Sequence, residues 1–203
     1  MSEKTTSPFS KEQLMPQAEM LEITRQKGEL LIGIPKESYK QEKRVCLTPD
    51  AVSALTAHGH RIVIETGAGL SANYADSEYS EAGAKISYDI KEAFECNIVL
   101  KVEPPSHEEI DMMNPQSVLF SALQLKTQTK KYFELLAKKR ITAVAFDFIR
   151  DEQGTFPVVK SLSEIAGTAS ILIASEIMSS DNNGFGLLVG NISGVPPTDV
   201  VIL

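Results

Sequence analysis

The sequence predicts an α/β fold built around one parallel β-sheet, either flavodoxin-like or Rossmann-like. The run at residues 30–34 is apolar and includes Gly33, a pattern typical of a strand buried on both faces. Thr48 and Pro49 then supply a capping hydroxyl and a proline, which together favour the start of a helix. Short apolar runs and helical stretches keep alternating along the chain, so this strand, loop and helix form the first of several such units.

The remaining elements follow from the same alternation. In the first helix Val52 and Leu55 face inward, and Gly59 is suited to end it. Further strands are predicted at residues 61–65, 85–88, 98–105, 117–123 and 141–149. Further helices are predicted at residues 75–82, 90–94, 106–113 and 128–140.

Local signals support several of these elements. Ser106 followed by Glu109 predicts a capping box at the start of its helix. The helix at 128–140 has a buried face made of Tyr132, Phe133, Leu135 and Leu136. The turn at residues 66–70 contains a single GxG with no third glycine and no Walker lysine, so its glycines indicate a tight turn with positive φ rather than a phosphate site.

The longest predicted helix spans residues 161–178. Its apolar stripe comprises Leu162, Ile165, Ala166, Ala169, Ile173 and Ile177. Ile171 and Leu172 lie off that stripe, so the helix is apolar nearly all round. Such a helix is expected to be buried between layers or between domains.

Composition narrows the class of protein. The chain has 203 residues, 42% hydrophobic and 23% charged, which is ordinary for a globular protein. A net charge of −7 argues against broad binding to nucleic acid or to anionic membranes, and we expect a small molecule or another subunit as the partner. The N-terminus lacks signal-peptide features and no long uninterrupted apolar segment occurs, which predicts a cytoplasmic protein without membrane insertion. Cys46 and Cys96 fit reduced thiols, and their spacing suggests no metal site.

The long loop at residues 35–47 is the first candidate for a functional site. Connections of this kind usually take two to six residues, and long ordered ones are more often functional. Arg44 in this loop precedes a helix N-terminus, and its guanidinium can grip a carboxylate or phosphate with two hydrogen bonds. The competing interpretation is that Arg44 pairs with its neighbours Glu37 and Glu42 or with water.

The strand at 98–105 carries the second candidate. Lys101 and Glu103 alternate on one face near the end of this strand, at the edge where open parallel sheets bind ligands. A lysine there can polarise a carbonyl. The alternative is a lysine that extends its charge to solvent from the end of a strand.

Three segments resemble the start of the alanine dehydrogenase and nicotinamide nucleotide transhydrogenase family, in matching order and spacing. These segments read IGIPKES, EKRVCLTPDAV and HGHRIVIETGAG. A later segment, DEQGTFPVVKSLSEIAG, is similar to alanine dehydrogenases in particular. The resemblance implies that this domain is paired with a nucleotide-binding Rossmann domain, and that Arg44 holds the carboxylate of pyruvate or alanine.

The same resemblance exposes two departures. Alanine dehydrogenases typically read KVK where this chain has Lys101, Val102 and Glu103, so a carboxylate replaces the lysine that touches the substrate. Gln124 stands where they carry a histidine that hydrogen-bonds the substrate and assists proton transfer. Glu103 would repel a substrate carboxylate unless it were protonated or paired, and glutamine cannot exchange a proton near neutral pH. The resemblance thus assigns Lys101, Glu103 and Gln124 to the catalytic positions.

The resemblance implies an NAD-dependent oxidoreductase that interconverts alanine with pyruvate and ammonia, with an uncertain substrate and a homo-oligomeric assembly. One alternative is the α subunit of a transhydrogenase, which moves hydride between nicotinamide nucleotides. A second is a binding or assembly module without catalysis. NAD is expected to bind mainly beyond Leu203, so this piece alone is expected to be inactive.

The predicted domain organisation has three parts. Residues 1–28 form an N-terminal extension that could include a helix, and residues 29–160 form the substrate-side domain. Residues 161–203 are an interdomain helix, a glycine-rich connector and the first strand of a truncated Rossmann domain. An apolar strand at the very end of the chain predicts either an N-terminal piece of a longer protein or an isolated domain.

Overall fold

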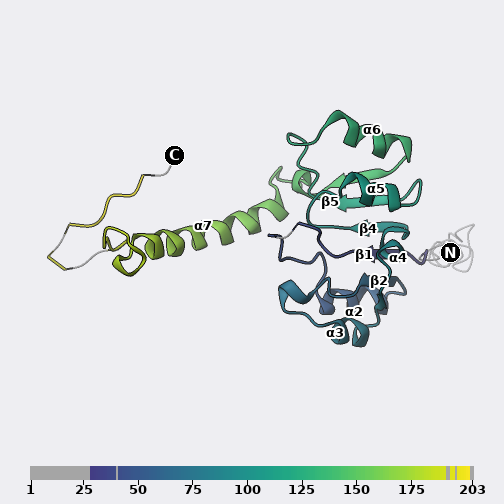
Figure 1. Cartoon of the computed structure of the whole chain (residues 1–203), viewed down its shortest axis with the longest axis horizontal. Helices are drawn as coiled ribbons and strands as arrows, with labels where there is room; N and C mark the ends of the chain where they lie inside the picture. Colours follow the sequence, from purple (N-terminus) through teal and green to yellow (C-terminus); the bar gives the residue numbers. More distant parts are fainter. Residues whose placement is uncertain (1–27, 40, 191–192, 195, 202–203) are drawn as a thin grey trace, which may run out of the picture.

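The computed structural model describes residues 28–39, 41–190, 193–194 and 196–201. It contains a six-stranded parallel sheet in the order β3-β2-β1-β4-β5-β6 (Figure 1). The strands are β1 (Leu31–Ile34), β2 (Arg61–Glu65), β3 (Lys85–Ser87), β4 (Ile98–Leu100), β5 (Val118–Ser121) and β6 (Thr142–Ala145). This is the Rossmann order, so the predicted α/β class is confirmed and the choice between two sheet types is decided.

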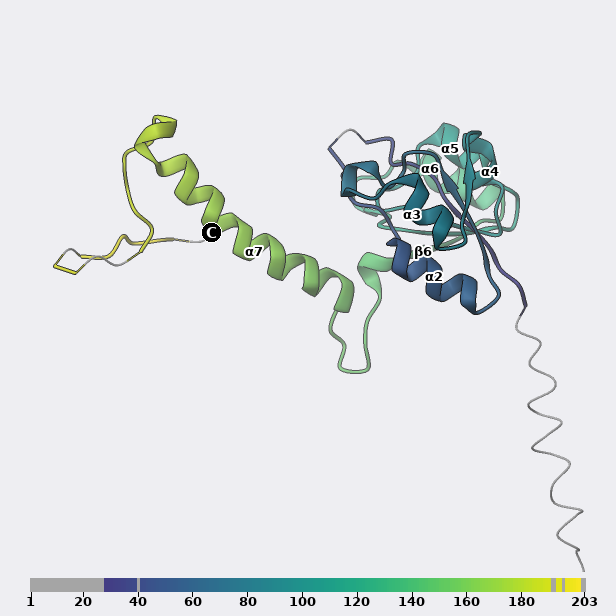
Figure 2. The ribbon, with the colours of Figure 1, turned by 90° about the horizontal axis from the view of Figure 1, so that it is seen from below.

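Helices cover both faces of the sheet (Figure 2). The helices are α2 (Pro49–Ala57), α3 (Asp76–Glu81), α4 (Ile90–Phe94), α5 (His107–Met112), α6 (Lys130–Lys138) and α7 (Pro157–Met178). Of these, α2 contacts α3, while α4 contacts α5 and α5 contacts α6. This grouping follows from right-handed crossovers, because the chain moves outward from β1 to β3 and then returns to β4 and proceeds the other way.

Two apolar clusters lie on the two faces. One joins alternate residues of β1 and β2 to α2 and α3, and it includes Ile32, Ile34, Val52, Ile62, Ile64 and Tyr79. The other lies under α4, α5 and α6, and it includes Phe94, Val99, Ile110, Met113, Leu119 and Leu136. The strands are buried on both sides, which explains why they read as continuous apolar runs.

Close packing fixes the glycine of β1. A Cβ atom at Gly33 would lie 1.8 Å from the carbonyl oxygen of Ala93, so only glycine allows α4 to approach the strand this closely. The predicted turn at residues 66–70 is present, but only Gly67 has a positive φ (+72°), whereas Gly69 has a φ of −87°.

The predicted caps form as the sequence indicates. The hydroxyl of Thr48 accepts a hydrogen bond from the backbone N–H of Ala51, and Ser106 and Glu109 form a reciprocal capping box. Several strands are shorter than predicted, since β4 ends at Leu100 and β6 ends at Ala145, where a short 3₁₀ helix (Phe146–Phe148) begins. Phe133 was expected in the core but is 38% exposed, whereas Tyr132 and Leu136 are buried.

Helix α7 differs most from the sequence-based expectation. It extends away from the sheet (Figure 1), and none of its residues is buried in the described part of the chain. The expected burial is therefore not met within this chain, because no second layer of described residues covers the helix. Its length and composition alone would allow it to cross a membrane, a property that core helices of water-soluble proteins share.

The predictions for the two ends lie largely outside the described residues. The possible helix within residues 1–28 falls on residues 17–26, which are outside them. Of the expected terminal strand at 200–203, Val200 and Val201 are described and adopt no regular structure.

Candidate functional site

The candidate site lies at the carboxyl edge of the sheet, between β1 and β4. The chain leaves these neighbouring strands toward opposite faces, which is the topological switch point where open α/β sheets bind ligands. The loop after β1 is held at both ends: the backbone N–H of Lys36 donates to Glu65 (2.8 Å), and the Tyr79 hydroxyl donates to the Leu47 carbonyl (2.8 Å). The sequence therefore makes a long but anchored loop that projects side chains over the switch point.

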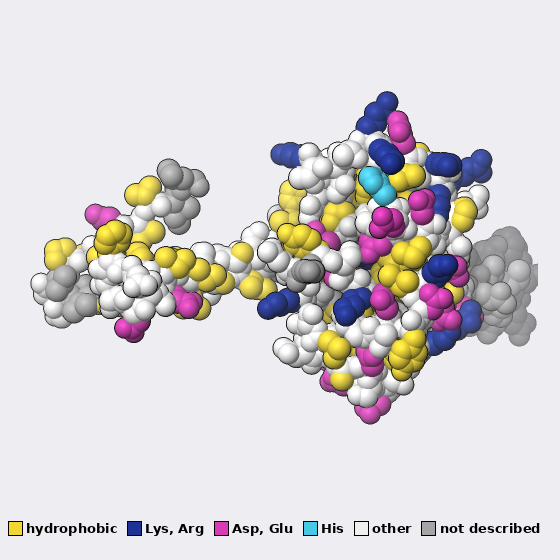
Figure 3. Space-filling view, viewed as in Figure 1, with side chains coloured by type: hydrophobic (Ala, Val, Ile, Leu, Met, Phe, Trp, Pro, Cys, Tyr) yellow, Lys and Arg dark blue, Asp and Glu magenta, His cyan; other side chains and the backbone are white. Residues whose placement is uncertain are grey.

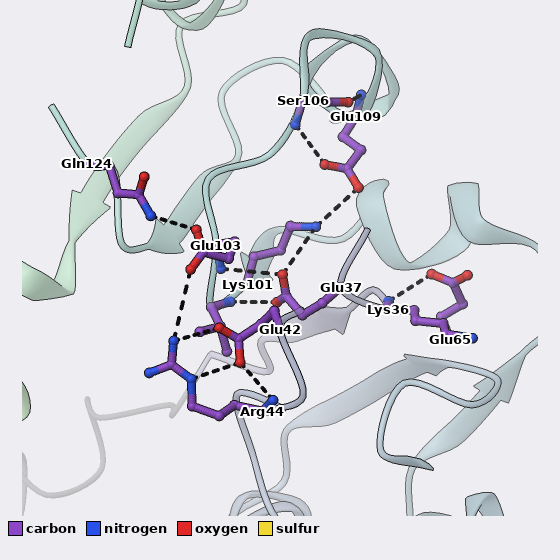
Figure 4. Close-up of polar contacts among 11 residues, drawn as sticks. Lys36, Glu37, Glu42, Arg44, Glu65, Lys101, Glu103, Ser106, Glu109 and Gln124 are labelled. Atoms are coloured by element: carbon purple, nitrogen blue, oxygen red, sulfur yellow. Dashed lines mark hydrogen bonds and ion pairs between the residues drawn. The ribbon is translucent and has the colours of Figure 1, made fainter. Parts of the chain in front are cut away.

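Glu37 spans the switch point itself (Figure 4). Its carboxylate accepts hydrogen bonds from the backbone N–H groups of Val102 (2.6 Å) and Glu103 (3.3 Å), which follow β4. Burial raises the pKa of Glu37, against the opposing effects of Lys101 and these two N–H groups. From the sequence, Glu37 stood out only as a neighbour of Arg44. Its contact with the segment after β4 joins residues far apart in the chain, so no local sequence pattern predicts it.

Lys101 lies inside the protein. Its side chain is fully buried, and its ammonium is 3.1 Å from Glu109 Oε1 and 3.6 Å from Glu37 Oε2. Glu109 is fixed in turn, because its other oxygen accepts from the backbone N–H of Ser106 (2.7 Å) in the capping box of α5. The ammonium is thus neutralised by two buried carboxylates, and neither of the two interpretations based on sequence, a carbonyl-polarising lysine or a solvent-reaching one, describes its environment.

Arg44 forms the ion pair that the sequence left open. Its Nε and Nη2 donate to the two oxygens of Glu42, at 2.8 and 2.6 Å, and Glu42 also accepts from the backbone N–H of Arg44. The pair lowers the pKa of Glu42, mainly through the side-chain hydrogen bonds, and raises that of Arg44. The Nη1 group donates to no other residue described in the structure, so one edge of the half-exposed guanidinium stays open.

Glu103 and Gln124 come together beside Arg44. Gln124 Nε2 donates to Glu103 Oε2 at 2.6 Å, and Glu103 Oε1 lies 4.0 Å from Arg44 Nη2. Gln124 adopts φ +46°, an uncommon conformation for a residue with a side chain, just after β5. The predicted site residues Arg44, Glu103 and Gln124 are therefore neighbours, while Lys101 faces inward from the same strand end.

An apolar groove begins next to this cluster. It has a volume of about 450 Å³ and lies between the loop after β1, the ends of β4 and β5, and the first turns of α7. Its lining includes Arg44, Leu100, Val102, Phe120, Phe146 and Leu162. A small organic acid could place its charged group on Arg44 and its carbon atoms in this groove.

The switch point does not fit a dinucleotide. A Rossmann phosphate site needs glycines that let the backbone approach the pyrophosphate, and the loop between β1 and α2 has none among its residues 35–48. The N–H groups that could hold an anion across this point already bind Glu37, whose negative charge would repel phosphate. The described residues also include no group of three or more side chains suited to a metal ion.

Comparison with known proteins agrees with this architecture. Residues 33–166 match the family described as "Alanine dehydrogenase/PNT, N-terminal domain". The chain belongs to this family.

Members of the alanine dehydrogenase/PNT family resemble the chain in both sequence and structure. Alanine dehydrogenases of Staphylococcus epidermidis and Methanococcus maripaludis are 36% and 37% identical, over 85% and 86% of this chain and 46% and 47% of their own length. A solved L-alanine dehydrogenase matches with a TM-score of 0.78 and 34% identity, over 83% of this chain and 46% of its own. A transhydrogenase from Sinorhizobium meliloti matches with a TM-score of 0.56 and 28% identity, over 61% of this chain and 37% of its own. The chain spans about half the length of the relatives it matches.

Proposed function

We propose that the chain is the substrate-side part of an NAD-dependent oxidoreductase that interconverts an amino acid, L-alanine or a close analogue, with its keto acid and ammonia. The observation that carries the proposal is the open edge of Arg44 at the switch point, next to the apolar groove. Membership of the alanine dehydrogenase/PNT family supports the reaction class.

In this proposal Arg44 binds the substrate carboxylate through its free edge, and Glu42 holds the guanidinium in the orientation that presents this edge. In the same proposal Glu103 and Gln124 are placed beside the reacting carbon and nitrogen of the substrate, because both residues neighbour Arg44. Lys101 acts as a positioning residue, because it holds Glu37 and thereby the backbone that carries Glu103. We further propose that a second domain beyond Leu203 binds NAD, that residues 29–160 form the substrate-side domain, and that the protein works in the cytoplasm as a homo-oligomer.

A second candidate is a transhydrogenase subunit, which needs no amino acid site. Glu103 and Gln124 in place of a lysine and a histidine favour this candidate, as does the likeness to the Sinorhizobium meliloti protein. A non-catalytic module would be favoured by the same two replacements. Two observables separate the three candidates: amino acids reduce NAD only in the first, and hydride passes between nicotinamide nucleotides without an amino acid only in the second.

The test uses the full-length protein. NADH formation is followed with L-alanine and other small amino acids, and NADH consumption is followed with pyruvate and ammonium, in wild type, Arg44→Ala and Arg44→Lys. Loss of a bidentate charged contact is expected to raise KM for the carboxylate substrate by about tenfold to a hundredfold in Arg44→Ala, with Arg44→Lys in between. The matched control is Arg61→Ala, which removes an arginine that pairs with Glu29 elsewhere on the surface.

Two outcomes would contradict the proposal. If Arg44→Ala kept the wild-type KM for L-alanine, the carboxylate would bind elsewhere. If no amino acid were turned over while hydride passed between nicotinamide nucleotides, the transhydrogenase candidate would replace the first.

A further inference from the structure

We propose that Glu103 accepts a hydrogen bond from the ammonium group of the substrate, so that the Arg44 and Glu103 pair selects a zwitterionic amino acid over the corresponding keto acid. This inference rests on the proposed function and specifies which form of the substrate the site prefers. It assigns a binding role to the residue that departs from the pattern of alanine dehydrogenases.

The geometry of Arg44 leaves room for a carboxylate at one defined edge. Glu42 occupies the Nε and Nη2 side of the guanidinium with two short hydrogen bonds. The edge formed by Nη1 and the second N–H of Nη2 is not used by Glu42, and a carboxylate can bind there with two parallel hydrogen bonds. The protein fixes the direction in which this edge points, since both oxygens of Glu42 accept hydrogen bonds from Arg44.

The carboxylate of Glu103 lies close to that same edge. The distance of 4.0 Å from Glu103 Oε1 to Arg44 Nη2 is too long for a direct hydrogen bond, so this oxygen keeps acceptor capacity toward the space next to the guanidinium. Glu103 Oε2 is held by Gln124 and the backbone N–H of Glu103 is held by Glu37, so the carboxylate is fixed from two sides (Figure 4). Its side chain is 25% exposed, which makes it reachable by a small ligand.

An α-amino acid carries its carboxylate and its ammonium on neighbouring atoms of one small unit. With the carboxylate on the open edge of Arg44, one of its oxygens approaches the Nη2 side, where Glu103 also lies. The substrate carboxylate and the Glu103 carboxylate would then repel each other. A positive group between them would attract both, and the ammonium of the zwitterion is such a group. Gln124 supports this arrangement because it orients Glu103 without adding charge.

The charge of the cluster disfavours a keto acid. Arg44 contributes one positive charge, whereas Glu42 and Glu103 contribute two negative charges, so the ionised cluster already has an excess of one negative charge. A keto acid would add a second negative charge and no donor for Glu103. Lys101 cannot compensate, since its ammonium is buried against Glu37 and Glu109.

The test compares three ligands that share a carboxylate: L-alanine, pyruvate and propionate, which lacks any polar group on the α carbon. Their dissociation constants are measured by calorimetry on the full-length protein, with and without NAD, for wild type, Glu103→Gln, Glu103→Asp and Glu103→Lys. Wild type should bind L-alanine more tightly than propionate or pyruvate. Glu103→Gln should weaken L-alanine by about tenfold or more and leave propionate unchanged or tighter.

The other variants separate charge from folding. Glu103→Asp retains the charge and should retain part of the preference for L-alanine, and Glu103→Lys should reverse the preference toward pyruvate. Glu108→Gln removes a negative charge from the exposed surface of α5 and should leave the dissociation constants of all three ligands unchanged. This variant controls for long-range electrostatics. Circular dichroism checks that each variant is folded.

Two results overturn the inference alone. One is an L-alanine affinity that is unchanged in Glu103→Gln, and the other is propionate that binds as tightly as L-alanine in wild type. Either result counts against the inference alone when Arg44→Ala, measured in the same way, still weakens L-alanine binding. A different result, in which neither pyruvate nor L-alanine nor any other small amino acid of the activity test binds with or without NAD, overturns the proposed function and this inference with it.

Discussion

Lys101 illustrates how much the role of a single residue depends on what surrounds it. Its ammonium lies in the interior between Glu37 and Glu109, and the aromatic ring of Phe94 lies below it, 5.9 Å from the ammonium. A buried charge without a partner is costly, so the three groups depend on one another. At the scale of residues the site is therefore a set of linked ion pairs rather than a collection of free catalytic groups.

The first prediction concerns the stability of this ion-pair set. Lys101→Met should lower the free energy of unfolding by about 3–5 kcal/mol, because Glu37 and Glu109 would then be buried without a cation. Urea unfolding followed by circular dichroism measures this, since the chain has no tryptophan. Lys85→Met removes an exposed lysine paired with Glu92 and should have a much smaller effect, and an equal effect of the two substitutions would show that burial is not the cause.

The second prediction concerns the thiols. Burial raises the pKa of Cys96 to about 11, and the surroundings of the partly buried Cys46 in the groove wall raise its pKa to about 12, so both thiols stay protonated at pH 8. Labelling with a thiol reagent, read by mass spectrometry, should be far slower in the native chain than in urea. Because the native pKa values are raised, the unfolded chain loses these protons first as the pH rises, and stability should decline above about pH 9. Rapid labelling of Cys96 in the native state would contradict this packing.

At the scale of elements, β1 depends on a contact that only glycine permits. Gly33→Ala would bring a Cβ atom to 1.8 Å from the Ala93 carbonyl oxygen, so either α4 or the strand must move. We expect a loss of about 3 kcal/mol or more in the free energy of unfolding, measured by thermal or urea denaturation. The matched control is Gly167→Ala in α7, where an added Cβ meets no atom within 4 Å, and where no loss of stability is expected. A tolerated Gly33→Ala would mean that α4 packs less closely than described.

Elements whose signals are local could be predicted from the sequence. The cap at Thr48, the capping box of Ser106 and Glu109, and strand β2 appear as expected because each depends on a few adjacent residues. The exposure of α7 could not be predicted in this way. Its apolar composition indicates a helix that needs a partner, and composition cannot tell whether that partner belongs to the same stretch of chain.

The site was predictable only in part, because some of its contacts join residues that are distant in the sequence. Arg44, Glu103 and Gln124 were each identified at the end of a strand or in a long loop, and they do lie together. The ion pairs of Lys101 connect residues 37, 101 and 109 through the tertiary fold. No spacing along the chain reveals such a set, because it forms only where the ends of β1 and β4 meet.

At the scale of the whole molecule, the exposed helix α7 is the main feature (Figure 3). Ile165, Leu172 and Ile177 are 67%, 69% and 65% exposed, so the helix presents several large apolar side chains to solvent. We predict that this 203-residue chain associates as its concentration rises, and that a variant with serine at these three positions does so less. Sedimentation velocity over a range of concentrations measures both.

A second variant of α7 tests whether three substitutions at polar positions of the same helix change association. Replacing Thr168, Ser170 and Ser175 with alanine leaves the apolar stripe intact and should leave association as strong as in the parent chain. If the serine variant and the parent chain sedimented identically at every concentration, the apolar surface of α7 would not drive association.

The carboxylate of Glu37 has one more consequence. Because it is tethered to the chain, its effective concentration at the two N–H groups after β4 is far above that of any dissolved ion. The Glu37 carboxylate therefore competes with dissolved anions for these two N–H groups, at the position where Rossmann sheets bind phosphate. We therefore expect free phosphate and nucleotides to bind poorly at these two N–H groups.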